Sequence, residues 1–148
     1  IAKADFQIAI PVFKKITLKF QADAGFSFGN KSVPFFNFDL GGYGYNTLNN
    51  FKHFYGYDFL SVSGNSYAKS ELTLDFKFLK KHHLNAAGNF ANVGDYLFNN
   101  TDWLSKASYT GYALGYGMET IIGPVELKYT WSPELPKGIA WVTVGFTF

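Results

Sequence analysis

The stretch that decides the fold is GIAWVTVGFTF, which runs from Gly138 to Phe148 at the end of the chain. Every second residue from Ala140 onward is apolar, and the residues between are mostly small or polar. Successive side chains point to opposite faces of a β-strand, so this alternation predicts a strand with one apolar face.

This ending resembles the last strand of bacterial outer-membrane β-barrels, where the barrel-assembly machinery recognises a C-terminal aromatic residue. The resemblance implies that Phe146 and Phe148 form an assembly signal and that Phe148 is a natural terminus. The remaining sequence has to agree with a barrel before this implication carries weight.

The composition agrees with a membrane β-barrel. The 148 residues suffice for one domain, aromatic residues make up 20% and charged residues only 16%. No stretch approaches the ~18 apolar residues that a membrane helix needs. The net charge of +2 argues against a nucleic acid as partner, and the absence of cysteine excludes disulfides and cysteine-metal sites.

Six further runs alternate in the same way as the final stretch. They are Ala2–Pro11, Ile16–Gly29, Tyr67–Phe78, Leu84–Ala91, Ser108–Ile121 and Val125–Trp131. The run from Ile16 continues for fourteen residues, whereas strands of soluble proteins average ~5–6 residues and membrane strands need ~9–11. The length therefore favours strands that cross a membrane.

The connections between these runs alternate between short and long. Short links at Val12–Lys15, Lys80–His83 and Ile122–Pro124 alternate with longer segments at 30–65, 92–106 and 132–137. Short periplasmic turns and longer external loops are typical of outer-membrane barrels. The sequence thus predicts an all-β, transmembrane antiparallel barrel in the bacterial outer membrane, surrounded by its lipids.

In this prediction the apolar face meets lipid and the polar face lines the lumen, where its lysines pair with its aspartates and glutamates. Tyrosine and tryptophan near strand ends are expected to form interfacial girdles; these residues are Tyr109, Tyr112, Tyr129, Trp131 and Trp141. A soluble lipid-binding barrel, with the apolar face inside, is the alternative.

Two short patterns could suggest chemistry, but their contexts argue against it. Gly25, Ser27 and Gly29 match a nucleophile elbow, yet no helix follows the strand as that elbow requires. His82 and His83 lie in a predicted polar turn, with no acidic residue at a spacing that suits metal binding. We therefore predict no catalytic, cofactor or metal site in this chain.

The segment 30–65 carries a more specific pattern. Leu40-Gly41-Gly42 is followed by Phe54-Tyr55-Gly56-Tyr57, which resembles the surface-antigen barrel family of outer-membrane assembly and two-partner secretion translocases. In that family a Val-Arg-Gly-Phe/Tyr loop tip folds into the lumen, and its arginine docks on the inner wall. Here Tyr55 replaces the arginine, so the salt-bridge lock and a translocase activity are in doubt, and an aromatic lock is the alternative.

Further family landmarks follow in order. Phe90–Gly94 resembles the family's Phe-x-Asp-x-Gly strand, and Ile122–Tyr129 resembles its Ile-Gly-Pro hairpin. The resemblance implies that the loop docks on the inner wall, and the expected wall residues are Glu71, Asn92, Gly111, Gly115 and Gly117.

The resemblance covers nearly the whole chain as the last seven strands of a sixteen-stranded barrel. Seven is odd, whereas bacterial single-chain barrels have an even number of strands. Either an additional strand lies in Val33–Leu40, or the chain is the C-terminal half of a larger barrel, which the abrupt start at Ile1 favours.

The Phe54–Phe59 variant looks most like the barrel of patatin-like phospholipases from Bacteroidetes-type bacteria. This implies a barrel that anchors and translocates an N-terminal lipid acyl hydrolase, whose catalytic residues lie upstream of this non-enzymatic segment. The alternative is a self-contained barrel of eight strands with a structural or adhesion role.

Overall fold

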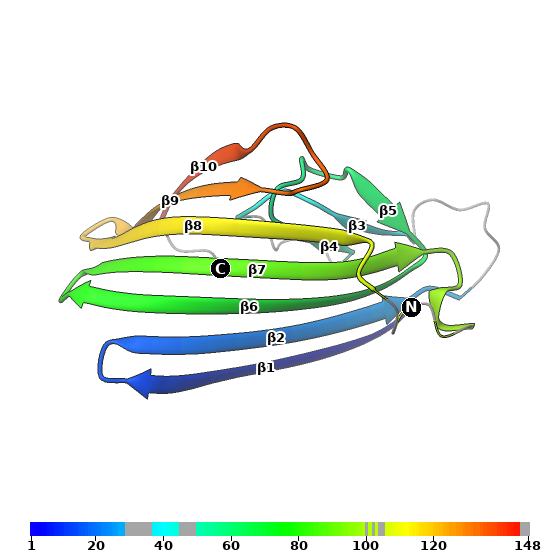
Figure 1. Cartoon of the computed structure of the whole chain (residues 1–148), viewed down its shortest axis with the longest axis horizontal. Coiled ribbons are helices and arrows are strands. Elements are labelled where there is room, and N and C mark those ends of the chain that lie inside the picture. Colours follow the sequence, from blue (N-terminus) through cyan, green and yellow to red (C-terminus); the bar gives the residue numbers. More distant parts are fainter. Residues whose placement is uncertain (29–36, 45–49, 100, 102, 104–105, 146–148) are drawn as a thin grey trace.

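A computed structural model of the chain describes residues 1–28, 37–44, 50–99, 101, 103 and 106–145. Its main element is an antiparallel sheet of seven strands in the order β1-β2-β6-β7-β8-β9-β10 (Figure 1). The strands are β1 (Ala2–Phe13), β2 (Ile16–Phe26), β6 (Ser66–Leu79), β7 (His82–Gly94), β8 (Tyr109–Thr120), β9 (Gly123–Trp131) and β10 (Ile139–Val144). The predicted all-β antiparallel architecture is confirmed, although among the described residues the sheet does not close.

The three tight turns lie at one end of the sheet and the long connections at the other (Figure 1). One prediction about these turns was wrong, because His82 and His83 are the first residues of β7. Both continue the backbone ladder, with His82 opposite Met118 and His83 opposite Gly117 of β8. A short 3₁₀ helix, Leu97–Asn99, interrupts the connection from β7 to β8. Within the described ranges, no helix is long and apolar enough to cross a membrane.

The two faces of the sheet have the polarity expected of a membrane barrel. Large apolar side chains of one face are exposed, including Phe6, Phe20, Leu72, Leu114 and Val142. Charged and polar side chains of the other face are buried; they include Asp23, Lys69, Glu71, Asn89 and Lys128. We call these the outer and the inner face. A water-soluble barrel buries its apolar face instead, so the soluble alternative does not fit.

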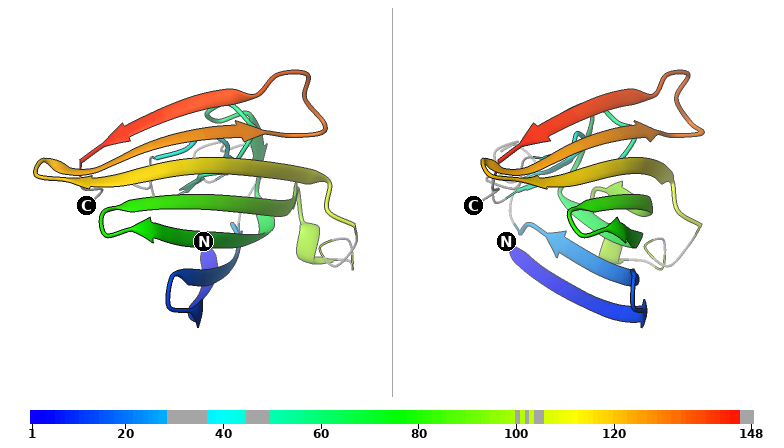
Figure 2. Two further views of the ribbon diagram at one scale, coloured as in Figure 1. Left: turned by 60° about the vertical axis from the view of Figure 1, so that its left-hand side comes forward. Right: turned by 90° about the vertical axis from the view of Figure 1, so that its left-hand side faces the viewer.

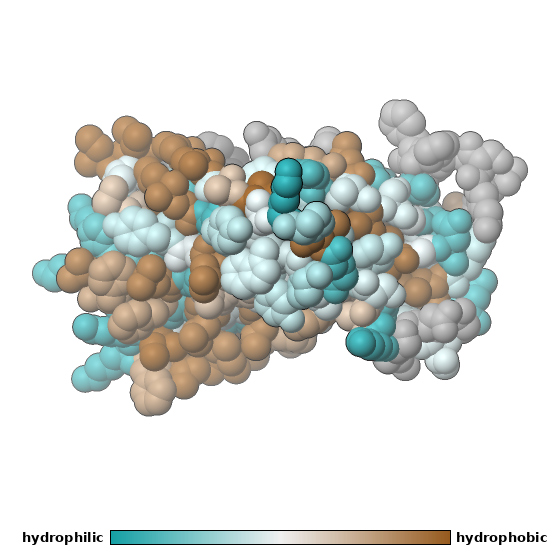
Figure 3. Space-filling view, turned by 45° about the horizontal axis from the view of Figure 1, so that its top comes forward, coloured by the Kyte–Doolittle hydropathy of each residue, from teal (hydrophilic) through white to brown (hydrophobic). Residues whose placement is uncertain are grey.

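The space-filling view shows part of this apolar surface (Figure 3). Apolar side chains gather over the strands in the half nearer to the tight turns, and hydrophilic side chains occupy its extreme end. Three of the five predicted girdle residues lie on the outer face, towards the end with the long connections. They are Tyr112, Tyr129 and Trp131, which alternate with inner-face residues along β8 and β9.

The other two predicted girdle residues face inward, which corrects the prediction. The ring of Tyr109 packs edge-on against Tyr57, and the indole N–H of Trp141 donates to Thr130 Oγ1 at 3.0 Å. Both positions share the inner-face register, so alternation along the strand outweighs the preference of aromatic rings for the membrane interface.

Residues 37–44 and 50–65 contribute a small second sheet, which lies against the concave inner face of the large one (Figure 2). Its strands are β3 (Phe38–Leu40), β4 (Phe51–Lys52) and β5 (Val62–Gly64), in the order β4-β3-β5. The sequence left open an additional wall strand in Val33–Leu40. The end of this segment is instead β3, a strand of the inner sheet, and residues 33–36 lie outside the described residues. Phe38, Leu40 and Phe54 pack with Tyr67 of β6 into a buried apolar cluster. We call residues 37–65 the inner loop.

Candidate functional site

The two halves of the predicted loop motif lie together. The backbone N–H of Phe54 donates to the carbonyl of Gly42 at 3.1 Å, and the N–H of Gly42 donates to the carbonyl of Tyr57 at 2.8 Å. Gly41 has φ +137°, and a Cβ there would lie 1.9 Å from the carbonyl oxygen of Asp58. Only glycine permits this close approach, so the Leu-Gly-Gly turn brings the tip into position.

The tip docks on the inner face through Tyr55. Its hydroxyl donates to Glu71 Oε1 of β6 at 2.9 Å, and both residues are buried. The carbonyl oxygen of Tyr55 lies so close to Gly111 of β8 that a Cβ on Gly111 would be 2.0 Å away. A hydrogen bond from a neutral hydroxyl to a carboxylate and a backbone-to-backbone contact therefore hold the tip.

Asn89 of β7 completes this backbone contact. Its side chain is fully buried, and its amide can accept from the N–H of Tyr55 at 2.9 Å while donating to the carbonyl of Gly111 at 3.2 Å. Buried polar groups are costly unless they are paired. Asn89 thus satisfies main-chain groups of the loop and of the wall at once.

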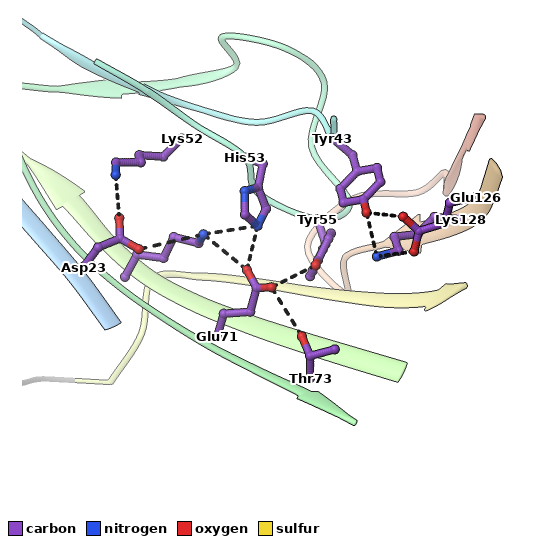
Figure 4. Close-up of polar contacts among 10 residues, drawn as sticks. Asp23, Tyr43, Lys52, His53, Tyr55, Glu71, Thr73, Glu126 and Lys128 are labelled. Atoms are coloured by element: carbon purple, nitrogen blue, oxygen red, sulfur yellow. Dashed lines mark hydrogen bonds and ion pairs between the residues drawn. The ribbon is translucent and has the colours of Figure 1, made fainter. Parts of the chain in front are cut away.

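Glu71 is also the centre of a charged network (Figure 4). Lys69 Nζ lies 3.2 Å from Glu71 Oε2, and His53 Nε2 lies 2.8 Å from the same oxygen. Burial, followed by the charge of Lys69, lowers the pKa of His53, which keeps the imidazole neutral at pH 7. The cation that balances Glu71 is therefore contributed by the wall and not by the loop.

Asp23 of β2 extends this network away from the tip. Its buried carboxylate lies 4.0 Å from Lys69 Nζ and 3.7 Å from Nζ of Lys52, which belongs to the inner loop. Lys52 also lies 3.2 Å from Asp5 of β1. The pairing of lysines with acidic residues that the sequence predicts for the lumen is thus present, and it ties the loop to β1 and β2.

Gly56 places the tip against a second connection. It has φ +80°, and a Cβ there would lie 2.4–2.6 Å from backbone atoms of Trp131 and Ser132. The hydroxyl of Tyr57 donates to Glu134 at 3.2 Å, and Thr110 Oγ1 donates to the same carboxylate at 2.6 Å. Residues 132–138, between β9 and β10, therefore pack against the tip.

The contact between Glu134 and the tip predicts that the stability of the fold depends on pH. Burial slightly opposes ionisation of Glu134, but hydrogen bonds from Ser132, Thr110 and Tyr57 outweigh it and lower the pKa below the usual 4.5. Such a carboxylate stabilises the fold above its ordinary pKa, and this stabilisation is lost as pH falls through the lowered value. We expect Glu134→Gln to reduce the apparent melting temperature above pH ~5 and to have progressively less effect towards pH ~3. Thermal unfolding of both proteins across this range checks it, and an effect that grows with acidity contradicts it.

Not all predicted wall residues lie at the tip. Asn92 donates to the carbonyl of Trp103 and accepts from the N–H of Ser108, so it contacts the β7–β8 connection and not the tip. Gly115 lies against Asn85 and Lys128, and a Cβ on Gly117 would make only an ordinary contact, 4.0 Å from the carbonyl oxygen of Val125. The proposed signal residues Phe146 and Phe148 lie outside the described residues.

The sequence motifs did not indicate Asn89, the residue of β7 that contacts the tip. Asn89 lies three positions before Asn92, and the strand alternation that buries Ala91 also places Asn89 on the inner face. His53 and Tyr43 were missed as well, because they lie outside the regular strand pattern. Alternation was the signal that could have identified Asn89.

The histidine pair also needs a correction. We expected no acidic residue at a spacing that suits metal binding, yet His83 Nδ1 lies 3.0 Å from Asp75 and its Nε2 lies 3.6 Å from Glu119. Asp75 lies diagonally opposite His83 in the β6–β7 pair, and Glu119 lies diagonally opposite it in the β7–β8 pair. Both contacts therefore depend on the register of the strands. In the part of the chain that the structure describes, no group of three or more His, Asp or Glu side chains is arranged to hold a metal. Ser27 follows the end of β2 and donates weakly to the carbonyl of Asn65. Residues 29–36, where a nucleophile elbow would continue, lie outside the described residues.

Comparison with known proteins gives one family. The chain matches the model of a family described as the OMP85 superfamily, over residues 1–148. No curated protein matches the chain.

Proposed function

The chain belongs to the OMP85 superfamily, and on this premise we propose that it anchors an attached N-terminal domain in the bacterial outer membrane and translocates it. Membership, together with the exposed apolar outer face, makes the chain an outer-membrane β-barrel domain. Barrel domains of this superfamily are generally not enzymes, so the function of this segment is one of membrane support and passage.

The inner loop is the functional element in this proposal. One observation carries it, namely that Tyr55 bonds to Glu71 while its backbone lies against Gly111. These contacts tie the loop to β6 and β8 in the middle of the concave face. The docked loop would obstruct the lumen and brace the wall, and its release would open a path for the attached domain.

The rest of the barrel would come from further strands of a longer chain. In the hydrocarbon core unpaired strand edges cannot be satisfied by water, so a wall with open edges at β1 and β10 must be closed by additional strands. A sixteen-stranded barrel would satisfy both closure and an even strand number. The attached domain would be a patatin-like lipid acyl hydrolase, as the resemblance of Phe54–Phe59 suggests.

The test uses the complete coding sequence expressed in a Gram-negative host. We expect Tyr55→Ala and Gly56→Ala to lower barrel stability and the amount of N-terminal domain that external protease can reach on intact cells. Tyr112→Phe, on the outer face, is the control that should change neither. Unchanged stability and display in both loop variants would refute the docking role.

A second experiment tests whether a lipid hydrolase is attached to the barrel domain. Lipid hydrolysis by the complete protein, with none by residues 1–148 alone, would support an attached hydrolase. If residues 1–148 alone fold into a closed monomeric barrel, the self-contained structural or adhesion protein is the better description.

A further inference from the structure

Tyr43 lies in the inner loop just after the Leu40-Gly41-Gly42 turn, and its hydroxyl bonds to a different strand from the hydroxyl of Tyr55. Its hydroxyl donates to Glu126 Oε2 at 2.5 Å and accepts from Lys128 Nζ at 3.0 Å. Both partners belong to β9, whereas the hydroxyl of Tyr55 bonds to Glu71 of β6 (Figure 4). Lys128 Nζ also lies 5.4 Å from the centre of the Tyr55 ring. The loop therefore meets the wall at two places.

Three wall strands build the pocket that receives Tyr43. Lys128 lies 3.1 Å from Glu126 and places its Nζ 4.2 Å from the centre of the Tyr43 ring, a cation–π distance. Asn85 of β7 donates to Glu126 Oε1 at 2.9 Å. A Cβ on Gly115 of β8 would lie 2.4 Å from Asn85 Oδ1 and 2.9 Å from Lys128 Cε, so the glycine leaves room for both side chains.

The protonation state suits this arrangement. Burial, followed by the neighbouring Glu126, raises the pKa of Tyr43. The hydroxyl thus stays protonated and can donate to the carboxylate while it accepts from the ammonium group. One tyrosine thus contacts both the buried ammonium group of Lys128 and the half-buried carboxylate of Glu126.

From this geometry we propose that Tyr43 is a second positioning residue of the inner loop, whose hydroxyl anchors the loop to β9 through hydrogen bonds that the hydroxyl of Tyr55 does not share. The inference rests on the proposed docking function of the loop and assigns it a second contact. With both anchors in place, the loop spans the inner face from β6 to β9 and ties together four neighbouring strands.

Tyr43 also stands between two hollows of the inner face. One, of about 490 Å³, is lined by Gln7, Lys19 and Gln21; the other, of about 550 Å³, is lined by Phe59, Trp141 and Thr143. Tyr43 and Gly44 line both. The Tyr43 ring therefore borders both spaces, and we expect its removal to join them.

A double-mutant cycle in the complete protein tests independence. Tyr43→Phe and Tyr55→Phe each delete one hydroxyl and keep the ring contact between the two tyrosines, whose centroids lie 5.8 Å apart. We expect each to lower the apparent melting temperature by about 2–4 °C. The double variant should show the sum, because the two hydroxyls bond different carboxylates and phenylalanine keeps the ring contacts that the two positions share. Tyr112→Phe is the matched control and should leave it unchanged. If Tyr43→Phe has no effect, or loses its effect in the Tyr55→Phe background, the second anchor does not exist.

Conductance in planar lipid bilayers gives a readout that a purely structural role would not change. Tyr43→Ala is expected to raise the single-channel conductance more than Tyr43→Phe, because only alanine joins the two hollows. Equal conductance of Tyr43→Ala and the wild-type protein would contradict the expectation that removal of the Tyr43 ring joins the two hollows. The proposed function fails separately, since unchanged display in the Tyr55→Ala and Gly56→Ala variants refutes it whatever the cycle shows.

Discussion

Replacement of Leu72 by arginine is expected to destabilise the membrane-inserted protein by about 2–4 kcal/mol, the cost of a cation at the middle of the lipid-facing wall. Leu72 lies near the centre of β6, and its side chain is 46% exposed on the outer face. In water this substitution at an exposed position would cost little. The large expected effect follows only if the outer face meets hydrocarbon.

The neighbouring Thr73 supplies the matched control. Thr73 lines the polar hollow beneath the tip, next to Lys19 and Glu71. We expect Thr73→Arg to cost less than Leu72→Arg, since the arginine can reach water in the lumen. Denaturant unfolding of the complete protein from lipid vesicles measures both. A larger loss for Thr73→Arg would mean that the two faces of the wall are assigned the wrong way round.

The wall could be predicted from the sequence because a strand of period two specifies its own faces. Once Leu72 and Leu74 are assigned to lipid, Lys69, Glu71 and Thr73 must face the lumen, and the structure has this arrangement. Strand ends were less accurate, as His82 and His83 show. Their membership in β7 depends on backbone pairing with β8, which a single sequence does not reveal.

The docking site could be predicted only in part. Alternation and the family resemblance directed attention to Tyr55, Glu71 and Gly111, which the structure places in contact. Asn92 was chosen by its place in a motif, whereas Asn89 lies at the tip because it shares the inner face with Ala91.

The contact of Tyr43 with Glu126 spans 83 residues. It depends on how the inner loop crosses the concave face, so no local pattern could indicate it. The face on which a side chain lies follows from the sequence, whereas contacts between the loop and a distant strand require the fold.

Gly111→Ala is expected to undock the tip of the inner loop. The added Cβ would lie 2.0 Å from the carbonyl oxygen of Tyr55 and 2.8 Å from its carbonyl carbon, so the backbone of the tip has to retreat. That movement breaks the hydrogen bond from Tyr55 to Glu71 and separates Tyr55 from Asn89. We expect a loss of about 1–3 kcal/mol in stability, as overpacking of this kind costs, and a higher conductance in planar bilayers.

Gly117→Ala distinguishes undocking from a general effect of alanine in β8. Gly117 is on the same strand and the same inner face, yet the nearest atom to an added Cβ there is 4.0 Å away. Both substitutions change the backbone preference equally, so their difference isolates the contact with Tyr55. Equal stability and conductance of the two variants would mean that the tip does not rest on Gly111. A loss confined to Gly111→Ala would instead show that the glycine is needed because the backbone of the loop occupies the space of its missing side chain.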